Sequence, residues 1–271
     1  MNDLLHFEFF RNALLMGLML SLLFGLLSFF MVLRNMVFMG AGIAHTAFGG
    51  VALGIVLGMN PLYTSLIFCA ASSLLISHLV RSGAMNYDTG IGIFFSFSMA
   101  FGALLIALRE AYTFDLSGYL FGNILSVNRS DLAVTSVTTI LFAAFLIAVF
   151  RELMFATFDF KVAEVSGVHT ARLDTTLFLF LAVIIVASVK MVGIILVSAL
   201  IALPASFGLM LSKRYVTVLW ISVTYALFTL TGGLFLSYAA DTPTGATVVV
   251  LGTTLYFIVY FIRAGLIRDG S

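Results

Sequence analysis

The sequence predicts an all-α protein that crosses a lipid bilayer eight or nine times as a helix bundle, and three observations support this fold class. Of the 271 residues, 62% are hydrophobic and only 9% are charged, whereas about a quarter of an ordinary soluble domain is charged. The mean hydropathy is +1.18. Apolar runs of about 20 residues, the length that crosses a ~30 Å hydrocarbon core as a helix, follow one another along the chain. Because a soluble globule needs a charged exterior, only a bilayer can solvate this much apolar surface.

The individual helices follow from the apolar runs and from the residues that interrupt them. The pair Asn60-Pro61 predicts a tight turn between two helices, because the residue before a proline avoids helical geometry. The interruption near Lys190 predicts either a turn or a kink at Gly193. The number of membrane spans is therefore eight or nine. The candidate spans are residues 12–33, 41–58, 61–80, 90–108, 131–150, 173–190, 192–211, 215–238 and 245–262.

The positive charges predict the orientation of the chain. Every second connection is basic, and by the positive-inside rule these connections are cytoplasmic, with Arg109, Arg129 and Lys190 as exceptions. The C-terminus then lies inside, and nine spans would put the N-terminus outside. The basic residues that define these connections are Arg34, Arg81, Arg151, Lys161, Arg172, Lys213, Arg214, Arg263 and Arg268.

Two connections are longer than the rest, and no additional domain is visible, so residues 1–271 form a single transmembrane domain. Residues of about 110–130, which include Phe121 and Gly122, are too short and too rich in glycine to span. They predict a short helix or re-entrant cap at the outer face. Residues of about 151–170 mix apolar and charged side chains. Asp159 is placed to start a short amphipathic helix over residues 160–167, lying along the cytoplasmic face.

The sequence contains no motif for nucleotide hydrolysis or for common enzyme chemistry. A Walker A phosphate loop, a dinucleotide-binding turn and a metalloprotease His-Glu-x-x-His are all missing. If transport is active, another protein therefore supplies the energy, and this chain is not itself an enzyme. The net charge of +1 gives no nucleic-acid footprint. Cys69, the single cysteine, rules out an internal disulfide and a thiolate cluster.

His45 is the leading candidate for contact with a transported ion. It lies near the start of the second predicted span among small residues, where an ion and neighbouring backbones can approach closely. Ionisable groups deep in a membrane are costly and usually functional, and a neutral imidazole is a good ligand for zinc, manganese or iron. The alternative is a packing histidine that donates to a carbonyl. One histidine makes a weak site, which suits a conduit.

Other candidate residues carry less specific signals. Asp241 lies in an outer loop, where it either attracts cations or caps a turn, the second being favoured. Pro204 interrupts the helical hydrogen bonds of its span and predicts a kink, which serves gating or only shape. His6, His78 and His169 are expected at the membrane interfaces, without a metal role.

The ordered set of short motifs resembles the permease subunits of ATP-binding-cassette importers for zinc, manganese and iron. The resemblance runs nearly end to end and is specific through the order and spacing of its elements. These elements are residues 32–35, the Gly-x-Gly-x-x-His ending at His45, residues 90–96, residues 120–125, Glu152, Phe158, Asp159, Ala163, Gly167, residues 192–197, residues 203–205 and residues 241–245.

The resemblance implies an assembly in a prokaryotic cell membrane. Two permease copies would pair around a central path, two cytoplasmic ATPase subunits would drive alternating access, and an extracytoplasmic binding protein would deliver the metal. No cofactor is bound permanently, and the divalent metal ion is cargo. The segment with Glu152, Phe158, Asp159, Ala163 and Gly167 resembles the coupling helix that docks on the ATPase.

The resemblance also identifies His45 with the family's membrane-path histidine. Many members have an acidic residue four positions earlier, on the same helix face, where this sequence has Ala41. A second ligand would therefore come from the paired subunit or from another helix, and the metal stays open among zinc, manganese and iron.

Two other transport classes share part of the pattern. A permease for a chelated metal or an organic cofactor would have the same architecture, but such permeases are usually longer and differ in their loop motifs. A stand-alone secondary cation carrier would need carboxylates within its spans, and this chain keeps nearly all of its acidic residues at span ends or in loops.

Overall fold

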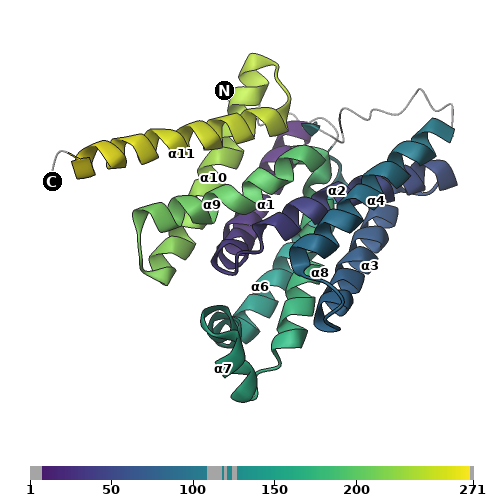
Figure 1. Cartoon of the computed structure of the whole chain (residues 1–271). Helices are drawn as coiled ribbons and strands as arrows, with labels where there is room; N and C mark the ends of the chain where they lie inside the picture. Colours follow the sequence, from purple (N-terminus) through teal and green to yellow (C-terminus); the bar gives the residue numbers. More distant parts are fainter. Residues whose placement is uncertain (1–7, 109–117, 119–120, 124–126, 269–271) are drawn as a thin grey trace.

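The computed structural model describes residues 8–108, 118, 121–123 and 127–268, and every regular element among them is a helix (Figure 1). The helices are α1 (Glu8–Leu33), α2 (Val37–Leu57), α3 (Pro61–Arg81), α4 (Tyr87–Leu108), α6 (Arg129–Phe158), α7 (Phe160–Val165), α8 (Thr170–Val192), α9 (Ile194–Leu211), α10 (Tyr215–Ala240) and α11 (Thr244–Arg268).

The described residues contain eight helices that are long and apolar enough to cross a membrane. The apolar α9 adds a shorter one of 18 residues. The predicted all-α bundle with eight or nine spans is thus confirmed. The chain is a multi-pass membrane protein.

Local sequence signals fix several helix ends. Asn60 caps α3 by accepting a hydrogen bond from the Leu62 N–H at 3.0 Å, with Pro61 in the first helical position. Asn128 and Asp131 form a reciprocal capping box at the start of α6. Gly58 ends α2, and its left-handed φ of 67° lets the chain leave the helix.

Two ends of the bundle can be distinguished by the residues that lie there. Glu8 forms an exposed ion pair with Arg129 at 2.6 Å, so α1 and α6 start at the same end, which also holds Asp241 after α10. We call this end the Asp241 end and the opposite end, where α7 lies, the α7 end. Figure 1 draws α11 running across the top of the bundle, with its C-terminal end at the left of the view and α7 at the bottom.

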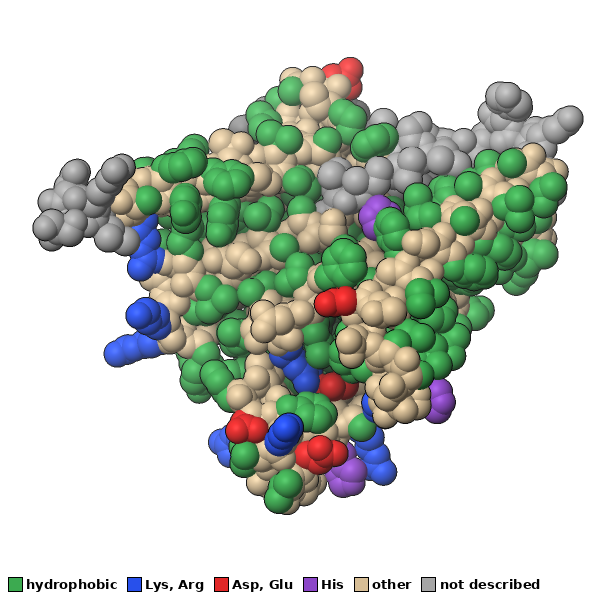
Figure 2. Space-filling model, viewed as in Figure 1, with side chains coloured by type: hydrophobic (Ala, Val, Ile, Leu, Met, Phe, Trp, Pro, Cys, Tyr) green, Lys and Arg blue, Asp and Glu red, His purple; other side chains and the backbone are tan. Residues whose placement is uncertain are grey.

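The core is formed by α1, α2 and α8, of which about two-thirds is buried, whereas α4 and α11 are mostly exposed. Glycines allow the central helices to approach their neighbours closely. A Cβ atom on Gly25 would lie 2.5 Å from the Val223 Cα of α10, and one on Gly50 would lie 2.5 Å from the Ser65 Cα of α3. Figure 2 shows hydrophobic side chains over most of the visible face, while charged side chains gather around α7.

The structure differs from the sequence prediction where the fifth predicted span ends. Helix α6 continues from the predicted limit at residue 150 to Phe158, so Glu152 lies in a helix and not in a connection. Helical backbone groups satisfy one another, and the exposed Arg151 and Glu152 can stay in water beyond the bilayer. The long connection predicted at about 151–170 is therefore two turns of α6, then α7 and a short turn.

Candidate functional site

His45 lies in the third turn of α2, counted from the α7 end. Its ring meets the ring of Phe95 on α4 edge to face, with centroids 4.8 Å apart and planes at 83°. One turn closer to the α7 end, a Cβ on Gly42 would collide with the Ile91 side chain, so α2 and α4 need the glycine there to pack this closely. The imidazole is therefore held beside α4 by a tight contact between helices.

His45 lies in a narrow strip along α2 that the neighbouring helices do not fully cover. Phe38, Ala41 and His45 follow one another at helical spacing, and all three are exposed or half-buried, whereas Gly42, Ile43 and Ala44 are buried. We call Phe38, Ala41 and His45 the open strip of α2. The helices of this chain thus cover the imidazole only in part.

The described part of one copy shows no cluster of ionisable metal ligands around His45. The described residues contain no group of three or more His, Cys, Asp or Glu side chains that could hold an ion. Ala41, one turn from His45, has no donor atom. His78 and His169 are exposed at the α7 end, and His6 lies outside the described residues. His45 is therefore not part of a cluster of three such side chains within the described residues.

Asp241 is not brought near His45. It follows α10 at the Asp241 end, whereas His45 lies 12 residues before the last residue of α2, about 18 Å along a helix axis. Asp241 has a left-handed backbone (φ 50°), and its N–H donates to the Ser237 carbonyl. This geometry favours the turn-capping interpretation over a cation site.

Pro204 and Gly193 shape α9 in different ways. Gly193, with φ 88°, separates α8 from α9, so the turn and not the kink is observed there. Pro204 lies within α9, and the N–H of the next residue, Ala205, donates to Ser28 Oγ of α1 at 3.0 Å. Since proline disturbs the local helical hydrogen bonds, this buried contact ties α9 to α1 at the weakened point.

The outer cap is described only in part. Gly122 has φ 79° and is buried, and a Cβ there would collide with the Met191 carbonyl oxygen at the end of α8. Phe121 is exposed by 43%. Residues 109–117, 119–120 and 124–126 of the predicted cap lie outside the described residues. The described part of the segment thus packs over the α8–α9 turn at the Asp241 end.

The short helix α7 forms where the sequence predicts it. Asp159 Oδ1 accepts a hydrogen bond from the Val162 N–H at 3.0 Å and so caps the helix. Ala163 is fully buried, and its carbonyl accepts from the Val168 N–H at 3.0 Å. Gly167 takes a left-handed φ of 88° that favours glycine, and this lets the chain turn into α8. Ala163 therefore packs α7 against the bundle, and the exposed Gly167 lets the chain leave α7.

A compact apolar surface lies on and beside α7. Phe158 is exposed by 70%, Val162 by 50% and Val165 by 91%. We call these three residues the α7 surface. Exposed charged residues surround it on the same segment, namely Arg151, Glu152, Lys161 and Glu164. An exposed apolar group with a charged rim is typical of a protein-docking site.

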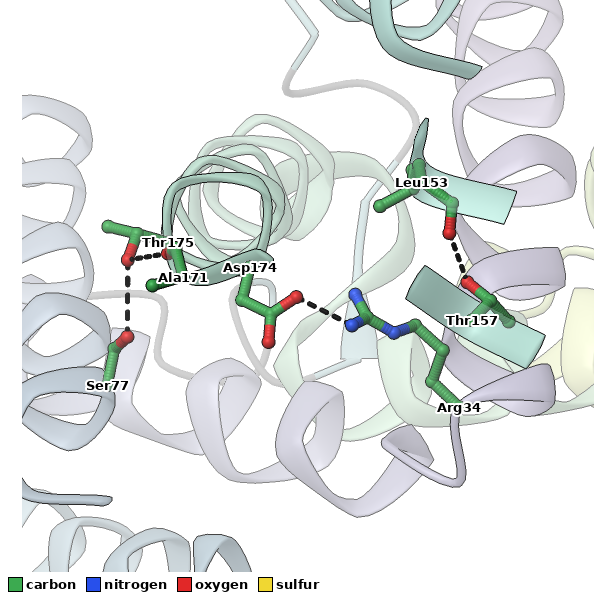
Figure 3. A network of polar contacts seen from close by, with 7 residues as sticks. All are labelled: Arg34, Ser77, Leu153, Thr157, Ala171, Asp174 and Thr175. Atoms are coloured by element: carbon green, nitrogen blue, oxygen red, sulfur yellow. Dashed lines mark hydrogen bonds and ion pairs between the residues drawn. The ribbon is translucent and has the colours of Figure 1, made fainter. Parts of the chain in front are cut away.

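The structure also contains a buried ion pair that the sequence reasoning missed. Arg34, in the α1–α2 turn, meets Asp174 of α8 at 2.6 Å, and the two side chains are exposed by only 4% and 8% (Figure 3). The sequence marks Arg34 as a basic residue that sets orientation and as part of the motif at residues 32–35, and it does not single out Asp174. The high cost of a charge near membrane depth was the available signal for Asp174.

Comparison with known proteins agrees with this architecture. A family model described as the ABC 3 transport family matches residues 6–263. The chain belongs to the ABC 3 transport family. The match covers all of the described membrane helices up to residue 263, so the family resemblance predicted from short motifs is confirmed.

Individual members of the ABC 3 transport family match over nearly their whole length. The manganese transport system membrane protein MntC of Listeria innocua is 31% identical, over 96% of this chain and 92% of that protein. The manganese import system permease protein ScaB of Streptococcus parasanguinis is 30% identical, over 96% and 93%. The solved structure of PsaBC from Streptococcus pneumoniae in complex with Fab superimposes with a TM-score of 0.84, at 28% identity over 96% of this chain and 94% of that one.

Proposed function

We propose that this ABC 3 protein is the permease subunit of an ATP-driven importer of divalent metal ions, with manganese as its first candidate cargo. The observation that carries the proposal is the family match over residues 6–263, together with relatives named for manganese transport that align end to end. Zinc and ferrous iron stay as competing cargoes, because an imidazole binds all three ions.

The α7 surface supports a role for a separate cytoplasmic ATPase. Phe158, Val162 and Val165 are exposed at the end of the bundle that carries most of the basic residues. By the positive-inside rule that end faces the cytoplasm. The α7 surface would fit an apolar groove of the ATPase, which would hydrolyse ATP and drive alternating access in this chain.

The open strip of α2 supports pairing of two permease copies around the ion path. His45 from each copy would face the path, and the pair would supply two imidazoles where one copy supplies one. Weak coordination of this kind allows the ion to leave again. A binding protein at the Asp241 end would deliver the metal.

The positions of the carboxylates argue against a stand-alone secondary carrier. The acidic residues of the described membrane helices all lie within about two turns of a helix end, namely Glu8, Asp88, Asp131, Glu152 and Asp174. Ion-coupled carriers need such groups near the bilayer midplane. An energy source outside this chain is the better explanation.

ATP hydrolysis by the complex of this chain, its ATPase and its binding protein tests the proposal. We expect the binding protein loaded with manganese to stimulate hydrolysis more than the same protein loaded with zinc or ferrous iron, because delivery of the correct cargo starts the cycle. Equal hydrolysis with loaded and metal-free binding protein would contradict the proposed function.

A further inference from the structure

Two adjacent side chains near the start of α8 contact two different parts of the bundle (Figure 3). Asp174 pairs with Arg34 of the α1–α2 turn at 2.6 Å. The next residue, Thr175, makes a longer contact of 3.4 Å with Ser77 Oγ of α3. The start of α8 therefore contacts both the α1–α2 turn and α3. The ion pair is the stronger of the two contacts.

Helix α7 is joined to α8 by a short, closely bonded turn. The Gly167 N–H donates to the Glu164 carbonyl at 3.1 Å, and the Thr170 N–H donates to the Val168 carbonyl at 2.8 Å. Ala163 and Thr170, on the two sides of this turn, are both buried. A displacement of α7 will therefore move the start of α8, and with it Asp174.

On the other side of the ion pair, Arg34 is coupled to the helix that carries His45. Arg34 and Asn35 form the turn between α1 and α2, and Asn35 has a left-handed φ of 56°. Helix α2 starts at Val37, so His45 is its ninth residue. A helix moves as a unit over this length, and a shift of Arg34 reaches the imidazole.

The burial of both charges makes the pair a firm connection. Removing one partner would leave an uncompensated charge in a low-dielectric site, so Arg34 is strongly favoured to follow Asp174 when α8 moves. A cavity of about 380 Å³ lies beside the pair and is lined in part by Arg34, Asn35, Tyr87 and Asp88. This space gives the arginine segment room to shift without a collision.

The Arg34 guanidinium also has a nitrogen atom that lacks a hydrogen-bond partner among the described residues. Its Nη1 atom is buried and has no hydrogen-bond partner among the described residues. A buried donor in this state needs an explanation, because most such groups are paired. A guanidinium that changes its surroundings during a cycle provides one.

We propose that the Arg34–Asp174 ion pair transmits movement of α7 to α2 and so positions His45 in step with the ATPase. Arg34 and Asp174 are positioning residues and do not contact the metal. The proposal rests on the proposed function, since it assumes that an ATPase acts on α7.

The first test is the amount of manganese imported for each ATP hydrolysed by reconstituted complexes. We expect Asp174→Asn to lower this ratio about tenfold, the size of a typical coupling between sites, while ATP hydrolysis continues. Thr175→Val and Asp88→Asn serve as matched controls. The first removes the weaker contact next to Asp174, and the second removes a carboxylate from the same cavity. Both should keep the wild-type ratio, and an unchanged ratio in Asp174→Asn would overturn the proposal.

The double variant Arg34→Met with Asp174→Leu keeps the test decisive if Asp174→Asn does not assemble. Replacing both members of a buried pair by apolar side chains is often neutral for stability. The measurement is the rate at which a thiol reagent labels His45→Cys, with and without a non-hydrolysable ATP analogue. We expect the analogue to change the labelling rate with the native pair and to leave it unchanged in the double variant.

If the ATP analogue changes the labelling rate equally with and without the ion pair, the proposal that the pair transmits movement of α7 to α2 is wrong. This readout needs no metal, so it separates the two proposals. If nucleotide changes the labelling of His45→Cys with the native pair present, but the wild-type complex imports no metal, the proposed cargo is contradicted and transmission through the ion pair is supported.

Discussion

His45→Ala is expected to lower ATP-dependent metal uptake by about tenfold or more, because loss of even an outer partner of a metal ligand typically costs 10–100-fold. Without the imidazole, the open strip of α2 would present only Phe38 and Ala41 to the ion. Uptake into proteoliposomes that contain the whole importer measures the effect.

His78→Ala provides the matched control for this prediction. His78 is exposed near the α7 end of α3, away from the open strip of α2, and its loss should leave uptake unchanged. If His45→Ala and His78→Ala import metal equally fast, His45 is a packing residue, and its contact with Phe95 is its whole role.

Asp159→Ala is expected to weaken binding of the ATPase about tenfold. The substitution removes the hydrogen bond to the Val162 N–H and with it the N-cap of α7, a loss of about 0.5–2 kcal/mol. A helix of six residues has little stability of its own, so the α7 surface would lose its shape. The affinity between the permease complex and its purified ATPase is the quantity to measure.

Asp159→Asn is the control for the cap, since asparagine caps helices about as well as aspartate. It should bind the ATPase like the wild type, while Asp159→Ala binds weakly and still inserts in the membrane. Equal binding by Asp159→Ala and wild type would remove the docking role from the α7 surface.

Much of the fold could be predicted because the bilayer imposes it on the sequence. Runs of apolar residues must be helical where no water can satisfy the backbone, and breaks such as Asn60-Pro61 have local causes that can be read directly. The start of α7 was predicted for the same reason, because Asp159 caps it locally. The end of α6 at Phe158 was not, since its last turns leave the membrane and carry charges.

The long-range features of the candidate site could not be read from the sequence. Arg34 and Asp174 are far apart in the chain, and only the packing of α1 against α8 makes their charges partners. The sequence left open whether the chain turns or kinks at Gly193, because this depends on how α9 packs. The φ of 88° at Gly193 lies at a break between α8 and α9. Sequence reasoning did select His45, but the partial exposure of its ring depends on which helices cover α2.

In the proposed permease, the two ends of the bundle have separate tasks. The α7 end would receive the ATPase through Phe158, Val162 and Val165, and the Asp241 end would face the binding protein. His45 lies between them on α2, in a strip that a second copy would complete. The Arg34–Asp174 pair would connect the first task to the proposed ion path.

The most direct test of the central claim is uptake of radioactive manganese into proteoliposomes that contain this chain, its ATPase and its binding protein, with zinc and ferrous iron as competitors. The account predicts uptake that requires ATP on the α7 side and is lowered most by unlabelled manganese. A complex that assembles and hydrolyses ATP but imports none of the three metals would contradict it.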